Sequence, residues 1–210
     1  LLLVTLLFSS VSLAAPMTTN STTMPKSYST GAHTANEVFP GISPTTGLPS
    51  DADYKPMVVQ ISNSKEARPH WNLSEADIVY ESIFWGPGHT RYTAIFNDNH
   101  PEYVGAVRSA RVNHCQIRQE WDAPFVFYGG QKQSGTSIED YFKTNNVAKQ
   151  FLLDGTGGGK TADGFFRASK RVVPPHAVAH PAEMGANHWP TNAEGHADLT
   201  KMPAYHFSST

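Results

Sequence analysis

Residues 105–111, which read GAVRSAR, carry side chains suited to binding an anion. A strand that runs here into a helix start would leave free backbone N–H groups beside the positive end of the helix. Ser109 has the chemistry of a helix N-cap. Arg108 and Arg111 are three positions apart, so both can face one side of the first turn. Arginine holds phosphate, sulfate or carboxylate through two parallel hydrogen bonds, so the segment indicates an anion site.

A second basic segment, residues 165–176, reads FFRASKRVVPPH and includes Arg167 and Arg171. Its two prolines stiffen the backbone and would set the direction of His176. A held histidine beside cations is a candidate general acid or base with a depressed pKa, or an anion ligand. The alternative is a solvated basic loop with a packed histidine.

Arg91, Asp77 and Glu81 are the other charged candidates. Strand alternation puts Arg91 on one sheet face, where it either pairs with Glu81 across a hairpin or points into a cleft. Asp77 and Glu81 are helical i,i+4 neighbours, or share a face if extended, so they could act as a catalytic carboxylate pair. The alternative is that these acids neutralise the arginines internally.

Two further segments partly match the motifs of a phosphate-binding loop and of a zinc site. Residues 155–161 (GTGGGKT) lack the first glycine of a phosphate-binding loop, because position 154 is Asp, and they do not lead into a clear helix. His176 and His180 have the spacing of a helical zinc pair but lack the glutamate of that motif, and prolines bracket them. We therefore expect no metal and no cofactor, and a mobile loop at 155–161.

The sequence predicts both strands and helices to position these candidate residues. The expected strands are residues 56–62, 78–85, 90–97, 103–107 and 124–128, and the expected helices are residues 110–122 and 137–144, the second capped by Ser137. Strands 78–85 and 90–97 flank a Gly/Pro loop and form a hairpin. The fold class expected is α/β or α+β, with helices packed on a mixed β-sheet that contains this hairpin.

The ends of the chain indicate export. Residues 1–14 form an apolar run that is too short to span a membrane and ends in small residues, as in a signal peptide. Residues 15–37 are rich in Ser and Thr and read as a flexible tether. Residues 38–210 are expected to form a single domain, with a further C-terminal part missing. The protein is thus expected outside the cytoplasm, secreted or at the cell envelope, with any membrane association through an N-terminal anchor.

Composition narrows the class of partner. The formal net charge is −2, which excludes a globally basic nucleic-acid binder. The single cysteine, Cys115, excludes an internal disulfide and is expected to be a small buried hydrophobe. The partner expected is an anionic small molecule or envelope polymer, and no nucleic acid.

Taken together, the motifs resemble the YerB-like bacterial lipoproteins, whose N-terminal domain has no known function. The matching segments are TTGLP (45–49), ARPHWNLSEADIVYES (67–82), TRYTAIF (90–96), GAVRSAR (105–111), FYGG (127–130) and FFRASKRVVPPH (165–176). The resemblance implies an envelope-located protein. Two features depart from the family: no cysteine follows the signal segment, and Ala177 stands where the family has Asn.

The resemblance also marks polar motif positions. They are Arg68, Asp77, Glu81, Thr90, Arg91, Arg108, Ser109, Arg111, Arg167, Arg171 and His176. Three functions remain open. The first is a module that binds an anionic ligand in an Arg/His-lined cleft. The second is an envelope hydrolase that acts on a phosphoester or glycan, with His176 as acid/base and Asp77 or Glu81 as its partner. The third is a structural or protein-interaction domain with internally paired arginines.

Overall fold

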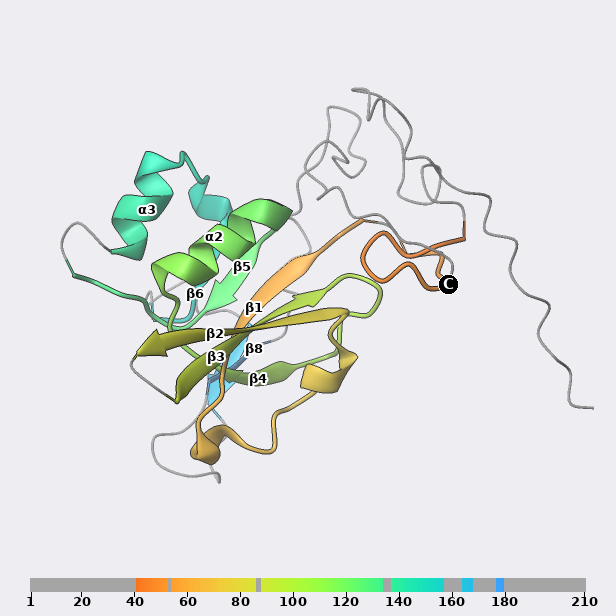
Figure 1. Ribbon diagram of the computed structural model, residues 1–210, viewed down its shortest axis with the longest axis horizontal. Helices are drawn as coiled ribbons and strands as arrows, with labels where there is room; N and C mark the ends of the chain where they lie inside the picture. Colours follow the sequence, from red (N-terminus) through yellow and green to blue (C-terminus); the bar gives the residue numbers. More distant parts are fainter. Residues whose placement is uncertain are drawn as a thin grey trace, which may run out of the picture.

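The structure, a computed structural model, describes residues 41–52, 54–85, 88–133, 137–156, 164–167 and 177–179. Eight strands in these ranges form one mixed sheet, with helices α2 and α3 on one side of it (Figure 1). The strand order is β2-β3-β1-β4-β8-β7, while β5 pairs with β1 and β6 pairs with β5. The expected mixed sheet with packed helices is confirmed, in an α+β arrangement.

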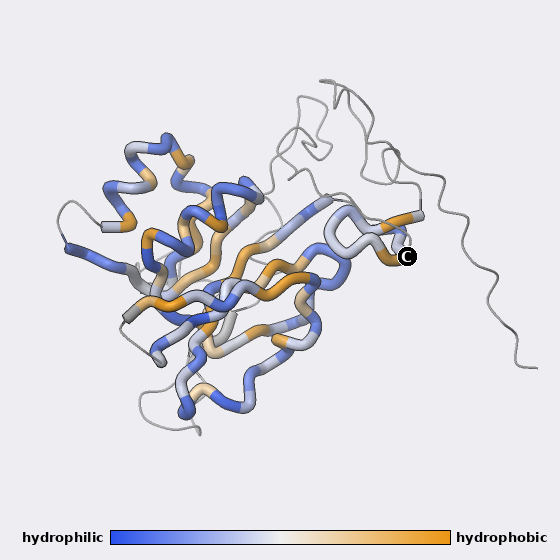
Figure 2. Tube along the Cα trace, in the orientation of Figure 1, coloured by the Kyte–Doolittle hydropathy of each residue, from blue (hydrophilic) through white to orange (hydrophobic). Residues whose placement is uncertain are grey.

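Strand β1 (Met57–Ser62) lies in the middle of the sheet, and all six of its residues are buried. Its apolar run, MVVQI, does not alternate with polar residues because both faces of the strand are covered. It pairs antiparallel with β3 along one edge. Along the other edge it pairs antiparallel with β4 and parallel with β5. In Figure 2 these central strands carry much of the hydrophobic colour.

The predicted hairpin is confirmed as β2 (Ile78–Trp85) and β3 (His89–Phe96). Its register runs from Ile78 opposite Ile95 to Trp85 opposite His89. This register decides which side chains share a face, because successive residues of a strand point to opposite sides.

Two apolar clusters lie on the two faces of the sheet. Helices α2 (Val112–Trp121) and α3 (Ile138–Thr144) cover one face, where Trp121 and Phe142 pack with Val58. The opposite face buries Met57 and Phe96 among other apolar residues. The remaining helical turns are η1 (Lys65–Ala67), η2 (Leu73–Glu75) and η3 (Lys149–Phe151). Among the helices described here, none has the length and apolar character needed to cross a membrane.

Three strands of the sheet run parallel. They are β1, β5 (Phe125–Phe127) and β6 (Leu152–Asp154), with α3 between the last two in the chain. Their carboxyl ends therefore meet at one edge, as do ligand-binding loops in many α/β sheets. The other strands are β4 (Val104–Val107), β7 (Phe165–Arg167) and β8 (Ala177–Ala179).

The expected start of helix α2 is wrong, and the observed start changes the role of Ser109. The helix begins at Val112 rather than at residue 110, and Arg111, not Ser109, is its N-cap residue. Arg108 N–H donates to the Gln60 carbonyl at 2.9 Å, and Tyr128 N–H donates to the Arg108 carbonyl at 3.1 Å. These bonds keep residues 108–110 extended between β1 and β5, so long-range pairing overrides the local cap signal.

The Ser137 cap of α3 offers a test of local stability. Ser137 Oγ accepts from the Asp140 N–H at 3.0 Å, as expected from the sequence. Replacing Ser137 by Ala should lower the free energy of unfolding by about 1 kcal/mol, because the cap bond is lost. Urea unfolding of Ser137→Ala beside Ser74→Ala, an exposed control, measures this. Equal stability of the two variants would contradict the cap assignment.

Candidate functional site

Three arginines gather where α2 begins. Arg91 comes from β3, while Arg108 and Arg111 come from the segment between β4 and α2. The guanidinium carbon of Arg91 lies 4.1 Å from the centre of the Phe84 ring, and that of Arg111 lies 5.3 Å from it. We call Arg91, Arg108 and Arg111 the arginine cluster. Its members converge although they are up to 20 positions apart in the chain.

The sheet register places Arg91 in this cluster. Arg91 lies opposite Ser62 of β1 on one side and opposite Ser82 of β2 on the other. Both neighbours are small, so the long side chain meets no bulky residue directly across either strand. Its Nη1 donates to the main-chain carbonyl of Ser109. Ser109 therefore contributes through its backbone rather than as the expected helix cap.

Two members of the cluster, Arg91 and Arg111, lack a carboxylate partner in the described chain. Neither Arg91 nor Arg111 forms an ion pair with a described Asp or Glu. Burial, followed by the neighbouring Arg111 and Arg108, lowers the pKa of Arg91 to about 10. Burial also lowers the pKa of Arg111. Both groups remain cationic at neutral pH, so they repel each other.

His114 lies behind the cluster and is fully buried. Its Nδ1 accepts from the Arg111 backbone N–H at 3.0 Å. Burial, then Arg91 and Arg111, lower the pKa of His114 to about 3, so the ring is neutral at pH 7. The ring proton must then sit on Nε2, which has no hydrogen-bond partner among the described residues. A buried donor without an acceptor costs free energy that a ligand oxygen would recover.

Sequence reasoning missed both His114 and Phe84. Each had a weak signal available: His114 stands three residues after Arg111, and Phe84 alternates onto the same strand face as Ser82. Neither signal says that the residue meets Arg91, because this contact depends on how β2, β3 and α2 pack together.

Asp77 and Glu81 do not join the cluster or each other. Asp77 Oδ2 accepts from Thr45 Oγ1 at 2.8 Å and from the backbone N–H groups of Asn97 and Asp98 at 2.8 and 3.0 Å. These bonds tie down the turn after β3. Glu81 lies opposite Tyr92, on the other sheet face from Arg91. The carboxylate pair that the spacing allowed is therefore not formed.

Glu81 belongs to a separate exposed network that includes Arg68. Its Oε1 accepts from Thr90 Oγ1 at 2.6 Å and from Asn63 Nδ2 at 3.0 Å. Arg68 Nη2 donates to Asn63 Oδ1 at 2.6 Å. Arg68 and Glu81 are thus linked through one amide, and Arg68 does not take part in the arginine cluster.

Several sequence-based candidates cannot be placed. His176 and Arg171 lie outside the described residues. So do residues 1–40, with the signal segment and the whole tether, and residues 157–161 of the 155–161 loop. Arg167 belongs to β7, and its side chain is not described. Their proposed roles stay predictions. Cys115 is buried as expected, and burial raises the pKa of its thiol to about 12. No trio of His, Cys, Asp or Glu in the described ranges could hold a metal ion.

Fold and motifs together define a family. Residues 45–193 match the family described as "Protein of unknown function (DUF3048) N-terminal domain", and the chain belongs to it. The expected resemblance to the YerB-like proteins is confirmed by two further matches.

The chain is 38% identical over 106 residues to a Bacillus subtilis (strain 168) protein named "Putative lipoprotein YerB", over 47% of this chain and 32% of that protein. It also resembles the crystal structure of the YerB protein from Bacillus subtilis, with a TM-score of 0.56 and 29% sequence identity. That match covers 66% of this chain and 46% of the solved one. Each match thus spans less than half of the relative.

Proposed function

We propose that this domain binds an anionic ligand at the cell envelope through the arginine cluster. One observation carries the proposal: Arg91 and Arg111 share the Phe84 ring, with no carboxylate pairing either of them in the described chain. Two cations brought together without an acid repel each other, and a bound anion would offset that repulsion. The third reading, a domain with internally neutralised arginines, requires acids that these two residues do not contact.

Three kinds of donor point to a phosphate or carboxylate as the bound group. Guanidinium groups offer paired N–H donors in a planar fork. The buried His114 Nε2–H lacks an acceptor within the described ranges. The start of α2 adds the positive end of a ten-residue helix. A group with several anionic oxygens can accept hydrogen bonds from more than one of these donors.

Two observations support the envelope location. The relative from Bacillus subtilis is named as a lipoprotein. The apolar residues at 1–14 have the length of a signal-peptide core. An exported anion-binding domain fits both, and its ligand would be a small molecule or an envelope polymer.

Thermal unfolding with and without phosphate tests the proposal. A ligand at 100 times its dissociation constant stabilises the native state by about 2.7 kcal/mol. For a domain of this size the expected rise in Tm is therefore about 5–10 °C. Sodium sulfate serves as a second anion, and sodium chloride at equal ionic strength controls for screening. A Tm that follows ionic strength alone, whichever anion is added, would refute anion binding.

A further inference from the structure

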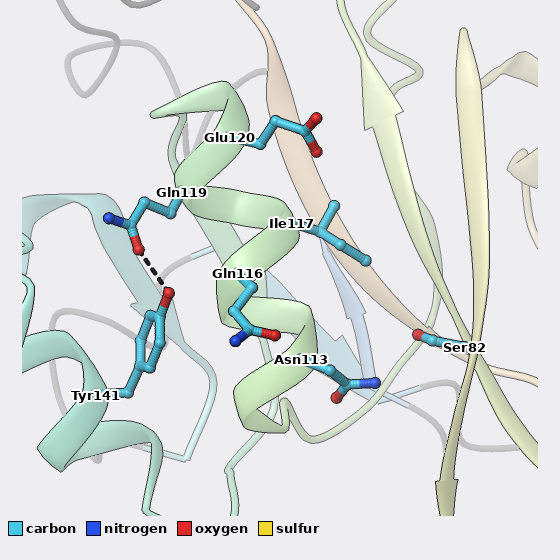
Figure 3. A pocket seen from close by; sticks show the side chains of 7 residues that line it. All are labelled: Ser82, Asn113, Gln116, Ile117, Gln119, Glu120 and Tyr141. Atoms are coloured by element: carbon cyan, nitrogen blue, oxygen red, sulfur yellow. Dashed lines mark hydrogen bonds between the residues drawn. The ribbon is translucent and has the colours of Figure 1, made fainter.

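A shallow groove runs along the exposed side of α2, between β2 on one side and α3 on the other (Figure 3). Its volume is about 640 Å³, within the range of small-molecule sites. The described lining residues are Ser82, Asn113, Gln116, Ile117, Gln119, Glu120 and Tyr141.

The lining is rich in groups that suit hydroxyls. Three side chains are amides, each of which can donate and accept hydrogen bonds, and Ser82 and Tyr141 add two hydroxyls. Glu120 is the one charged residue of this lining, whereas exposed helix faces usually carry many charges. Hydroxyl groups both donate and accept, so a polyhydroxylated ligand matches this lining better than an apolar or purely ionic one.

Two hydrogen bonds fix part of the groove in place. Tyr141 OH donates to Gln119 Oε1 at 2.5 Å, which orients that amide (Figure 3). Asn113 Nδ2 donates to the Ile83 carbonyl at 3.2 Å and joins α2 to β2. The Ser82 hydroxyl, in contrast, is buried without a hydrogen-bond partner in the part of the chain that the structure describes. An unsatisfied hydroxyl at the wall of the groove favours a polar occupant.

The groove begins next to Arg91 of the arginine cluster. Ser82 lies opposite Arg91 in the β2–β3 register, where facing Cβ atoms are about 5 Å apart. Asn113 follows Arg111 by two residues. From Asn113 to Glu120 the helix rises about 10 Å. A ligand with its acidic group on the arginines can thus lay its remaining atoms along α2.

We propose that the ligand is a sugar acid or sugar phosphate, with the acidic group on the arginine cluster and the hydroxyls in the groove. This inference rests on the proposed function, because it gives the anion site a second, hydroxyl-binding part. Carboxylate and phosphate share the required charge, and free sugars and polymer ends share the hydroxyls.

Calorimetric titration with matched probes tests the inference. Glucose 6-phosphate should bind roughly 10-fold more tightly than inorganic phosphate, because groove hydrogen bonds add to the anion contacts. The affinity for glucuronate should exceed that for acetate by a similar factor. Binding of glucuronate rather than glucose 6-phosphate would distinguish a carboxylate ligand from a phosphate ligand. Gln116→Ala removes an exposed amide from the groove. In this variant the affinity for glucose 6-phosphate should exceed that for inorganic phosphate by a factor of only about 3. Gln150→Ala, an exposed glutamine outside the groove, should leave the wild-type ratio unchanged.

The possible outcomes separate the two proposals. Equal affinity for glucose 6-phosphate and inorganic phosphate overturns the groove inference and leaves the anion site standing. A tenfold ratio that Gln116→Ala and a second variant, Ser82→Ala, both leave intact also overturns it. Failure of all four anions to bind removes the proposed function and the inference with it.

Discussion

Replacing Arg91 by glutamine should weaken anion binding by about two orders of magnitude. Arg91 is half-buried between β1 and β2, and its guanidinium lies at the Phe84 ring that Arg111 shares. Truncating one partner of a buried, hydrogen-bonded charge pair costs about 2–5 kcal/mol, and each 1.4 kcal/mol is a factor of ten. Titration of phosphate into the wild type and Arg91→Gln measures the loss.

Two control variants distinguish a specific role of Arg91 from an effect of overall charge. Arg91→Lys keeps the charge but loses the planar fork, so its affinity should fall between those of the wild type and Arg91→Gln. Arg68→Gln removes an exposed arginine of the Asn63 network, so its affinity should stay close to that of the wild type. Equal losses in Arg68→Gln and Arg91→Gln would show that binding depends on overall charge and not on the cluster.

Acidification should destabilise the protein through His114. In the native state its pKa is about 3, whereas an unfolded histidine titrates near 6.5. As the pH falls, the unfolded state therefore binds the proton before the native state does. The contribution of His114 to the free energy of unfolding is complete above pH 6.5 and is lost as the pH falls toward 3. Between pH 7 and pH 4 the loss is about 3 kcal/mol.

Urea unfolding at pH 7 and pH 4 isolates this effect in His114→Gln. Glutamine can still accept from the Arg111 N–H but does not titrate, so the variant should lose about 3 kcal/mol less than the wild type on acidification. His89→Gln, which removes an exposed histidine, should keep the wild-type pH dependence. The same pH dependence in the wild type and His114→Gln would contradict a neutral, buried His114.

Much of the scaffold could be predicted because its signals are local. The apolar run of β1, the Gly/Pro loop of the β2–β3 hairpin and the Ser137 cap of α3 each act within a few residues. The motif at 105–111 contributes Arg108 and Arg111 to the arginine cluster, while its role as an anion site stays a prediction. The start of α2 could not be predicted, because residues 108–110 are held extended by hydrogen bonds to β1 and β5.

The partners of Asp77 and Glu81 likewise depend on long-range contacts that the local sequence does not specify. The spacing of Asp77 and Glu81 allowed a carboxylate pair or ion pairs with arginine. Their actual partners, Thr45 and Asn63 among them, are distant in the chain or depend on strand register. A shift of the hairpin register by two residues would give every one of these side chains different neighbours.

Sequence by itself determined the family, the elements and the segments that hold the cations, since motif spacing, hydrophobic period and turn residues are properties of the chain. The tertiary structure alone decided that Arg91 and Arg111 meet at Phe84, that His114 keeps a buried N–H without an acceptor, and that an amide-lined groove begins beside them. The physical reason is that these features depend on strand register and on the packing of α2, which join residues far apart in the chain.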